Sequence, residues 1–260
     1  MSWDNFFYDM QESMSLYPDA TKLLQKLDNS FLSFINTETV YHVKIPSLIS
    51  EDVLRKCGYF STFPQHLTFL TPFLSSENGL RYSRKFLTPA ACIHIYPMLK
   101  REREINACYT TKERVYRYEN GEFEHPERLW EFTVREMVFV GSTKYVLSKL
   151  TLIKNKALSF AKTIDTNAEL RSACDLFYPS KENNVQRRLQ LANHAKDELL
   201  LSLDGRKIAV ASFNYHGSHF SKAFDFDEQG NIVTGCIGFG LERWILCCYS
   251  NSNYNAIKNN

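Results

Sequence analysis

The chain has 260 residues, with 31 Lys and Arg against 29 Asp and Glu, so its formal net charge is only +2. Hydrophobic residues make up 44% of it, which is ordinary for a globular protein and excludes wholesale disorder. This charge balance gives no general reason to bind a polyanion such as nucleic acid.

No segment directs the chain to a membrane. Residues 1–9 carry an acid where a signal peptide needs a basic region. The apolar run at residues 244–249 is far too short to cross a bilayer. The seven cysteines are odd in number and irregularly spaced, which disfavours a disulfide framework. We therefore expect a cytoplasmic protein with no membrane partner, whose thiols are free or metal-bound.

The N-terminal half changes from helical to strand-forming patterns. Residues 1–44 are expected to be a helical segment, because apolar residues recur at helical spacing over residues 16–32. Residues 48–54 have the Ser and acidic residues of a helix start. The aromatic, proline-containing stretch 59–73 is typical of loop and strand. From residue 86 to residue 141, β-branched and aromatic residues predominate.

A hairpin with a polar loop is predicted within that region. One strand enters a turn at Asn120-Gly121, and a long return strand covers residues 129–140. Further on, Asp204-Gly205 is a second hairpin turn signal. Periodicity predicts helices over residues 142–162, 183–200 and 241–249, and strands over residues 207–215, 219–227 and 232–240.

No repeat or flexible linker divides the chain. We therefore expect one α+β domain over residues 1–260, with a mainly antiparallel sheet. The Asn-rich tail at residues 250–260 is expected to fray.

The hairpin concentrates charged and aromatic residues. A strand period of two places Arg117 and Glu119 on one face, and Phe132 and Glu136 on one face of the return strand. One surface would then display a guanidinium, two carboxylates and an aromatic ring. Residues 235–243, Gly-Cys-Ile-Gly-Phe-Gly-Leu-Glu-Arg, predict a glycine-bearing strand that runs into a helix. Glycine allows a ligand close to the backbone, and Arg offers a planar fork for phosphate.

These stretches resemble motifs of the class II aminoacyl-tRNA synthetases. Arg117-x-Glu119, a loop and Arg128-x-x-x-Phe132 resemble motif 2, and Gly-x-Gly-x-Glu-Arg at residues 238–243 resembles motif 3. Residues 57–64 are placed like motif 1, whose proline lies at the dimer interface, which implies a homodimer. The stretches Arg-Val-Tyr-Arg-Tyr-Glu-Asn-Gly, Arg-Glu-Met-Val-Phe-Val-Gly and Ala-Ser-Phe-Asn-Tyr-His are similar to the atypical zinc-dependent seryl-tRNA synthetases and their truncated relatives, the amino acid–carrier protein ligases.

The resemblance covers roughly residues 45–249 and implies an antiparallel sheet flanked by helices. It also implies amino acid activation, in which a carboxylate attacks the α-phosphate of ATP bound with Mg²⁺. The implied catalytic residues are Arg117, on the α-phosphate and the attacking carboxylate, and Arg243, which holds the outer phosphate with Arg128. Phe132 would stack on adenine, and Glu131 would accept a hydrogen bond from its amino group.

The resemblance further implies a zinc ion on Cys92, Glu136 and Cys236, although their spacing gives no support of its own. The alternative is structural, because a buried cysteine usually acts as a small apolar residue. Two thiolates and a carboxylate leave the fourth tetrahedral position open for a substrate. The α-amino group of the amino acid would bind there, with Glu119 nearby.

Other polar residues have weaker assignments. Ser212, Asn214 and His216 alternate on one strand face and match the family pattern before motif 3, which implies contact with substrate; otherwise they face solvent. Lys196-x-Glu198 is placed like a Lys-x-Glu that reaches the nucleotide or metal, and could equally be an exposed pair. Residues 207–211 lack the acid that class II enzymes commonly use for magnesium, so the magnesium ligands stay open.

Three functions follow from these observations. The first is ligation of a small amino acid to the phosphopantetheine thiol of an acyl or peptidyl carrier protein. The second is a seryl-like aminoacyl-tRNA synthetase, and the third is a regulatory protein that has lost catalysis. We favour the first and expect no tRNA partner, because the sequence has neither an excess of Lys and Arg nor a basic arm or anticodon-binding extension.

Overall fold

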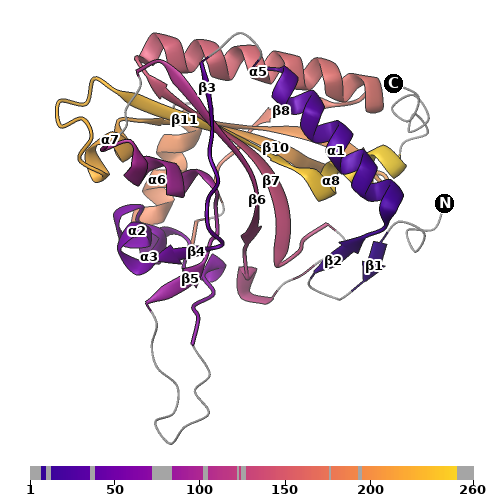
Figure 1. Cartoon of the computed structure of the whole chain (residues 1–260), viewed down its shortest axis with the longest axis horizontal. Helices are drawn as coiled ribbons and strands as arrows, with labels where there is room; N and C mark the ends of the chain where they lie inside the picture. The colour runs from indigo at the N-terminus through magenta and orange to yellow at the C-terminus, as the bar shows by residue number, and fades with distance from the viewer. Residues whose placement is uncertain are drawn as a thin grey trace, which may run out of the picture.

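A computed structural model describes residues 7–9, 13–35, 39–71, 84–101, 105–121, 123, 127–175, 177–192 and 195–250. Within these residues, a seven-stranded sheet forms the centre of the fold (Figure 1). Its neighbouring strands are antiparallel, apart from the parallel pair β3 and β6. In spatial order the strands are β3 (Val40–His42), β6 (Ala107–Tyr116), β7 (Glu131–Gly141), β11 (Val233–Gly240), β10 (Arg206–Gly217), β9 (Lys196–Leu203) and β8 (Glu169–Ser172).

Two small antiparallel sheets accompany the large one: β1 (Phe7–Asp9) pairs with β2 (Met14–Leu16), and β4 (Leu48–Ser50) pairs with β5 (Lys85–Leu87). Among the described residues, no helix is long and apolar enough to cross a membrane. The helices are α1 (Pro18–Ser33), α2 (Glu51–Lys56), α3 (Tyr59–Thr62), α4 (Ile95–Met98), α5 (Thr143–Ile164), α6 (Lys181–Ala192), α7 (His219–Ala223) and α8 (Leu241–Ser250), with 3-10 turns η2 (Pro64–His66), η3 (Cys92–His94) and η4 (Glu119–Gly121).

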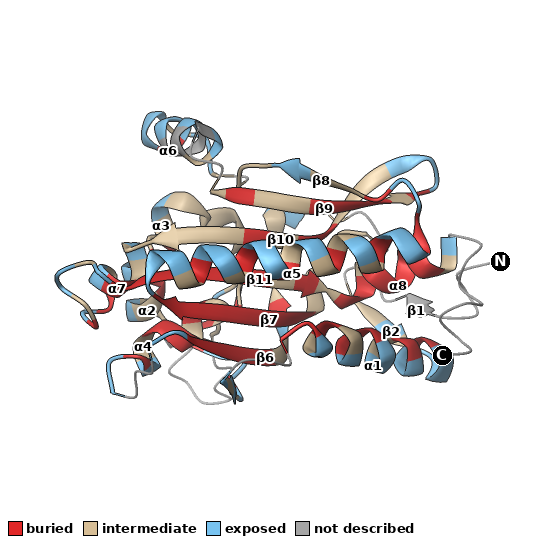
Figure 2. Ribbon diagram, turned by 90° about the horizontal axis from the view of Figure 1, so that it is seen from above, coloured by how far each residue is buried: buried red, intermediate tan, exposed pale blue. Residues whose placement is uncertain are grey.

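The central strands divide their side chains between two faces, as the pleat of a strand requires. On β7, Met137 and Phe139 belong to one apolar cluster, whereas Val138 and Val140 belong to another. The first cluster also contains the buried residues of α1, α5 and α8. Figure 2 shows α5 lying over the central strands and running along them, and it contacts β7, β10 and β11. The helices α1, α5 and α8 therefore cover one face of the sheet. The opposite face carries the second apolar cluster.

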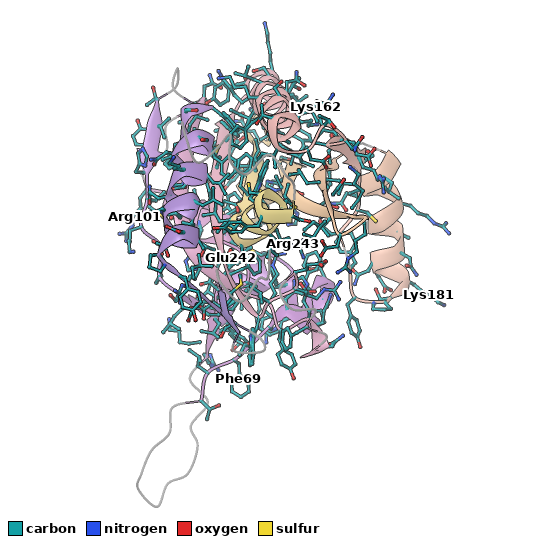
Figure 3. The ribbon with its side chains drawn as sticks, turned by 90° about the vertical axis from the view of Figure 1, so that its right-hand side faces the viewer. Phe69, Arg101, Lys162, Lys181, Glu242 and Arg243 are labelled. Atoms are coloured by element: carbon teal, nitrogen blue, oxygen red, sulfur yellow. The ribbon has the colours of Figure 1, made fainter. Side chains whose placement is uncertain are left out.

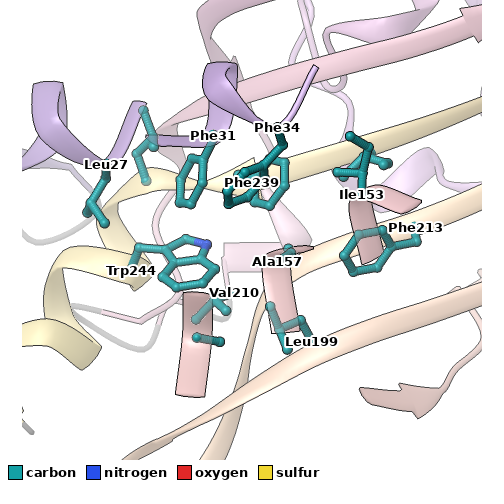
Figure 4. Packing of buried hydrophobic residues seen from close by; sticks show 14 of the residues in the cluster. Leu27, Phe31, Phe34, Ile153, Ala157, Leu199, Val210, Phe213, Phe239 and Trp244 are labelled. Carbon is teal, nitrogen blue, oxygen red and sulfur yellow. The ribbon is translucent and has the colours of Figure 1, made fainter. Parts of the chain in front are cut away.

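An aromatic cluster joins α1 and α8 to the covered face (Figure 4). The rings of Phe31 and Phe239 stack with their centroids 4.3 Å apart, and Trp244 lies 5.0 Å from Phe31. None of the three side chains is exposed. Because Trp244 follows Arg243 in the chain, this packing also fixes the first turn of α8.

A buried ion pair ties α1 to the sheet. Arg135 on β7 donates from Nε and Nη2 to the two carboxylate oxygens of Asp28, at 2.6 and 2.9 Å. The side chains are only 7% and 2% exposed, and Lys112 Nζ lies 3.0 Å from the same carboxylate. Burial alone would raise the pKa of Asp28, but its bonds with Arg135 and Lys112 lower it below the usual value.

Most of the regular elements are where the sequence predicts them. The hairpin of β6 and β7, the helix α5 and the turn at Asp204-Gly205 are confirmed. Ser50 caps α2, accepting a hydrogen bond from the Val53 amide at 3.4 Å. Residues 1–44 contain α1 as predicted, but also β1, β2 and β3.

Three of the predicted elements are wrong. The helix predicted over residues 183–200 ends at Ala192, and residues 196–203 form β9, because the run of leucines there also fits a buried strand. Residues 219–223 form α7 instead of a strand, with Phe220 and Phe224 one helical turn apart against Tyr96. Residues 59–66 form α3 and η2 instead of loop and strand. Phe73 and the tail at residues 251–260 lie outside the described residues.

We predict that Asp28→Ala destabilises the protein by about 3–5 kcal/mol, because the substitution leaves the buried Arg135 guanidinium without its counterion. Asp19→Ala on the same helix removes one partner of an exposed pair with Lys22 and should cost less than about 1 kcal/mol. Equilibrium denaturation of the two variants measures both values. Equal, small losses would contradict a structural role for the buried pair.

Candidate active site

A cavity of about 330 Å³ opens on the sheet face that the three helices leave free. That volume lies at the lower end of the range for small-molecule sites. Its floor consists of alternate residues on four neighbouring strands, and its walls come from the loops around them. Figure 3 shows Glu242 and Arg243 at the start of α8, near the centre of the molecule.

Strand register brings four floor residues into one row across the sheet. Glu198 on β9 lies opposite Ser212 on β10, Ser212 lies opposite Gly238 on β11, and Gly238 lies opposite Glu136 on β7. The next row consists of Lys196, Asn214 and Cys236. Every residue of both rows lines the cavity. Ser212, Asn214 and His216 alternate along β10, and all three line the cavity. Their contact with a substrate stays a prediction.

The packing of the cavity floor explains why residue 238 is a glycine. A Cβ atom at this position would lie 3.1 Å from Glu136 Oε2 and 3.4 Å from Val134 Cγ2. The missing side chain leaves room for the Glu136 carboxylate to lie over β11, beside Cys236.

A group of two thiols and one carboxyl lies at one end of the cavity. The ligand atoms of Cys92, Glu136 and Cys236 are all within 4.8 Å of one another. Cys92 comes from η3, outside the large sheet, so only the fold brings it to the other two. Burial raises the pKa of Glu136 to about 7, even though hydrogen bonds from the two cysteines and the charge of Arg117 lower it.

This donor set fits a zinc ion. Cysteine sulfur together with a carboxylate is a ligand combination that zinc accepts, and three protein ligands leave one coordination position for a substrate. A bound cation would also balance the negative charges that two thiolates and a carboxylate carry when they act as ligands. The structure thus brings together the three residues that the sequence places far apart.

Motif 2 supplies two arginines and an aromatic ring to the cavity. Arg117 Nε donates to the Pro89 carbonyl at 2.9 Å, and its guanidinium carbon lies 5.5 Å from the centroid of Phe132. Arg128 Nε lies 3.3 Å from a carboxylate oxygen of Glu119. Both guanidinium groups are therefore held by protein acceptors beside the ring.

A third arginine enters from the start of α8. Arg243 donates from Nε to the Glu127 carbonyl at 2.8 Å and from Nη1 to the Ala209 carbonyl at 2.9 Å. Burial lowers its pKa from the usual arginine value, and the nearby Arg117 and Arg128 lower it further. A site with three arginines this close together favours a ligand with several negative charges.

One predicted site residue lies elsewhere. Glu131 is not among the residues that line the cavity, and its carboxylate pairs with the exposed Arg114. Glu131 and Phe132 are neighbours on β7, so their side chains point to opposite faces of the strand. Glu131 therefore lies on the other side of β7 from the cavity, and its contact with adenine stays a prediction. The other ten predicted residues line the cavity: Cys92, Arg117, Glu119, Arg128, Phe132, Glu136, Ser212, Asn214, Cys236 and Arg243.

The structure adds Asp175 and Gln190 to the predicted pair Lys196-x-Glu198, whose two residues both line the cavity. Lys196 Nζ lies 2.8 Å from Asp175 and 3.0 Å from Glu198. Burial lowers the pKa of Lys196, but these two carboxylates raise it above its usual value. Gln190 on α6 also donates to Asp175 at 2.8 Å. Asp175 lies in an irregular segment without a recognisable motif, so only the structure shows that it belongs to the cavity.

Glu242 is a second addition, although it belongs to the Glu-Arg pair of motif 3. Its two carboxylate oxygens accept hydrogen bonds from the Thr133 amide at 2.9 and 2.8 Å. Burial raises the pKa of Glu242 to about 7. The carboxyl group links the first turn of α8 to β7, beside Phe132.

Solved structures share this fold. The crystal structure of M. kandleri SerRS in complex with A. aeolicus tRNASec matches with a TM-score of 0.81 over 96% of this chain and 55% of that one, at 19% identity. The prolyl-tRNA synthetase of Cryptosporidium parvum matches with a TM-score of 0.70 over 95% of this chain and 49% of that one, at 18% identity. The chain has a class II aminoacyl-tRNA synthetase-like fold.

Sequence comparison gives two kinds of relative for this class II fold. A type-2 serine–tRNA ligase of Methanococcus maripaludis is 26% identical over 90% of the chain, and an amino acid–[acyl-carrier-protein] ligase of Bradyrhizobium diazoefficiens is 26% identical over 82%. The chain spans about half the length of the first relative, 53%, and 70% of the second. No protein-family model matches the chain.

The glycines of motif 3 provide a test of the cavity floor. Gly238→Ala should keep the fold but push the Glu136 carboxylate aside, and we expect about a 10-fold or greater loss of zinc affinity. Gly240→Ala is the matched control, because its Cβ would meet nothing closer than the Val210 carbonyl at 3.8 Å. Competition with a chelator measures both affinities, and equal affinities would disprove the packing of Glu136 over Gly238.

Proposed function

We propose that the cavity binds ATP together with a small amino acid and forms an aminoacyl-adenylate. The observation that carries this proposal is the position of three arginines and an aromatic ring beside the Cys92–Glu136–Cys236 group, within one cavity. The ring and the arginines suit a nucleotide triphosphate, and the three ligands suit a metal that binds an amine.

In this account the amino acid carboxylate attacks the α-phosphorus, and the bond to the bridging oxygen of pyrophosphate breaks. Arg117 binds the α-phosphate and the attacking carboxylate, while Arg128 and Arg243 bind the outer phosphate. Phe132 supports the adenine ring. Such a reaction depends on alignment and on neutralising the charge of the phosphates, which fixed guanidinium groups provide.

The amino acid occupies the other end of the cavity. Cys92, Glu136 and Cys236 would hold zinc, which supplies a Lewis acid for the substrate α-amino group. Glu119 and Ser212 lie on the cavity wall and floor, where they can bind the rest of a small amino acid. For magnesium we propose the carboxylates of Glu127 and Glu198, because both residues line the cavity and Mg²⁺ prefers oxygen ligands.

We propose a carrier-protein thiol as the acceptor of the activated amino acid. The thiol attacks the carbonyl carbon of the adenylate, AMP leaves, and a thioester remains. The Bradyrhizobium relative supports this acceptor, and so does the nearly balanced charge of the chain. A tRNA acceptor is the second candidate, supported by the serine–tRNA ligases among the relatives.

The predicted homodimer stays a prediction. It depends on the likeness of residues 57–64 to motif 1, yet Cys57, Tyr59 and Phe63 of that segment line the cavity. Lining the cavity therefore accounts for the aromatic residues of this segment without a partner subunit.

Arg243→Ala should lower amino-acid-dependent ATP–pyrophosphate exchange by about 100- to 1,000-fold, because it removes a fixed positive charge from the phosphates. Arg114→Ala, on the opposite side of the hairpin beside Glu131, should exchange at a near wild-type rate. Thermal unfolding of both variants checks that the fold is kept. If no amino acid supports exchange by the wild-type protein, the regulatory alternative is favoured instead.

The acceptor is tested by following a labelled amino acid from the loaded enzyme. We expect label in a holo-carrier protein and none in total tRNA, with the apo-carrier protein, which lacks the thiol, as control. Charging of tRNA without any label in the carrier protein would instead support a seryl-like synthetase.

A further inference from the structure

Two side chains of β10 direct nitrogen atoms at the sulfur of Cys236, one of the three residues of the Cys92–Glu136–Cys236 group. His216 Nε2 and Asn214 Nδ2 each lie 3.6 Å from Cys236 Sγ. Asn214 and His216 are two residues apart on β10, so they share the strand face that carries the cavity floor. Cys236 itself is buried on the neighbouring strand.

The surroundings of His216 allow its proton to lie on Nε2, which is the nitrogen that faces the sulfur. Its Nδ1 faces two hydroxyl groups, Tyr96 Oη at 3.3 Å and Thr234 Oγ1 at 3.1 Å. Neither Tyr96 nor Thr234 is exposed, so solvent does not compete for these groups. A hydroxyl can donate its hydrogen to a bare ring nitrogen, which leaves the proton on Nε2. His216 thereby becomes an N–H donor directed at sulfur.

The orientation of Asn214 follows from the same chemistry. A cysteine that binds a metal is a thiolate and has no hydrogen to give, so only a donor can face it favourably. The Asn214 amide has two hydrogens on its nitrogen, and that nitrogen also lies 3.3 Å from Ser212 Oγ. The amide thus bridges Ser212 and Cys236, and its oxygen stays available to the cavity.

We propose that Asn214 and His216 are positioning residues of the metal centre, which hold the Cys236 thiolate through two N–H···S hydrogen bonds. This inference rests on the zinc site of the proposed function. The two bonds fix the side-chain rotamer of Cys236 and draw negative charge from its sulfur. A less electron-rich sulfur leaves more positive charge on the metal, which strengthens its attraction for an amine.

Metal binding by the full-length protein tests this without any amino acid or ATP. Zinc affinity is measured by competition with a chelator, and Co²⁺ replaces zinc to report sulfur–metal charge transfer by absorption. His216→Ala and Asn214→Asp should each weaken zinc binding by about 10- to 100-fold. Their charge-transfer band should move to longer wavelength, because a sulfur without donors loses its electrons more easily.

Two variants separate positioning from a structural effect. His216→Gln places an amide donor at a similar reach and should restore affinity and spectrum towards wild type. His219→Ala removes a nearby histidine that is not part of the Cys92–Glu136–Cys236 group. It should change neither the zinc affinity nor the charge-transfer band. Thermal unfolding of the metal-free proteins checks that each variant folds.

Other results would overturn the proposal. Wild-type affinity and an unmoved band in both His216→Ala and Asn214→Asp would exclude the hydrogen bonds. If the cobalt d–d bands of His216→Ala show that a ligand has been lost, His216 is itself a metal ligand and not a positioning residue. A wild-type protein that binds neither metal would refute the centre itself, whereas failure of adenylate formation with normal metal binding would refute only the proposed reaction.

Discussion

The two-residue alternation of the central strands is the constraint on which both the core and the cavity depend. On β11, Ile237 and Phe239 pack under the helices, while Cys236 and Gly238 face the cavity. Gly235 lets α5 approach, because a Cβ atom there would lie 2.9 Å from Val146 and from Leu150. A register slip of one residue would bring the polar set under the helices and the apolar set into the cavity. Burial of the apolar face therefore also fixes where the polar residues lie.

The charged groups on the cavity face of the sheet are largely removed from water, so they need partners within the protein. Arg243 and Arg117 each give hydrogen bonds to backbone carbonyls, and Lys196 lies between two carboxylates. These bonds hold the cations in place before any ligand arrives. A ligand with several negative charges then meets groups that need little reorganisation, which is where a protein obtains most of its electrostatic advantage.

The sequence predicts the parts of the fold that rest on local patterns. The hairpin of β6 and β7 follows from strand-forming residues and a turn, and α8 forms where the glycine-bearing strand is predicted to run into a helix. The strand β9 was missed because consecutive leucines have no period of their own, so only pairing with β10 makes them a strand. The helix α7 was missed because its five residues carry too little periodic signal, and its form depends on the packing of Phe220 on Tyr96.

The site was predictable only to the extent that its residues lie in recognisable motifs. Cys92 could be joined to Glu136 and Cys236 through the family resemblance, and the fold brings the three together. Asp175 has no motif and reaches the cavity through its bonds with Lys196 and Gln190. Glu131 is next to Phe132 in the sequence but points to the other side of β7, where it pairs with Arg114.

The central claim is that one sheet face binds the nucleotide and a metal-bound amino acid side by side. The most direct measurement is a crystal structure with a non-hydrolysable aminoacyl-adenylate analogue, with anomalous data collected at the zinc edge. The account predicts adenine against Phe132, the phosphate mimic beside Arg117, and an anomalous peak among Cys92, Glu136 and Cys236. An analogue bound elsewhere, or no peak among those three residues, would contradict it.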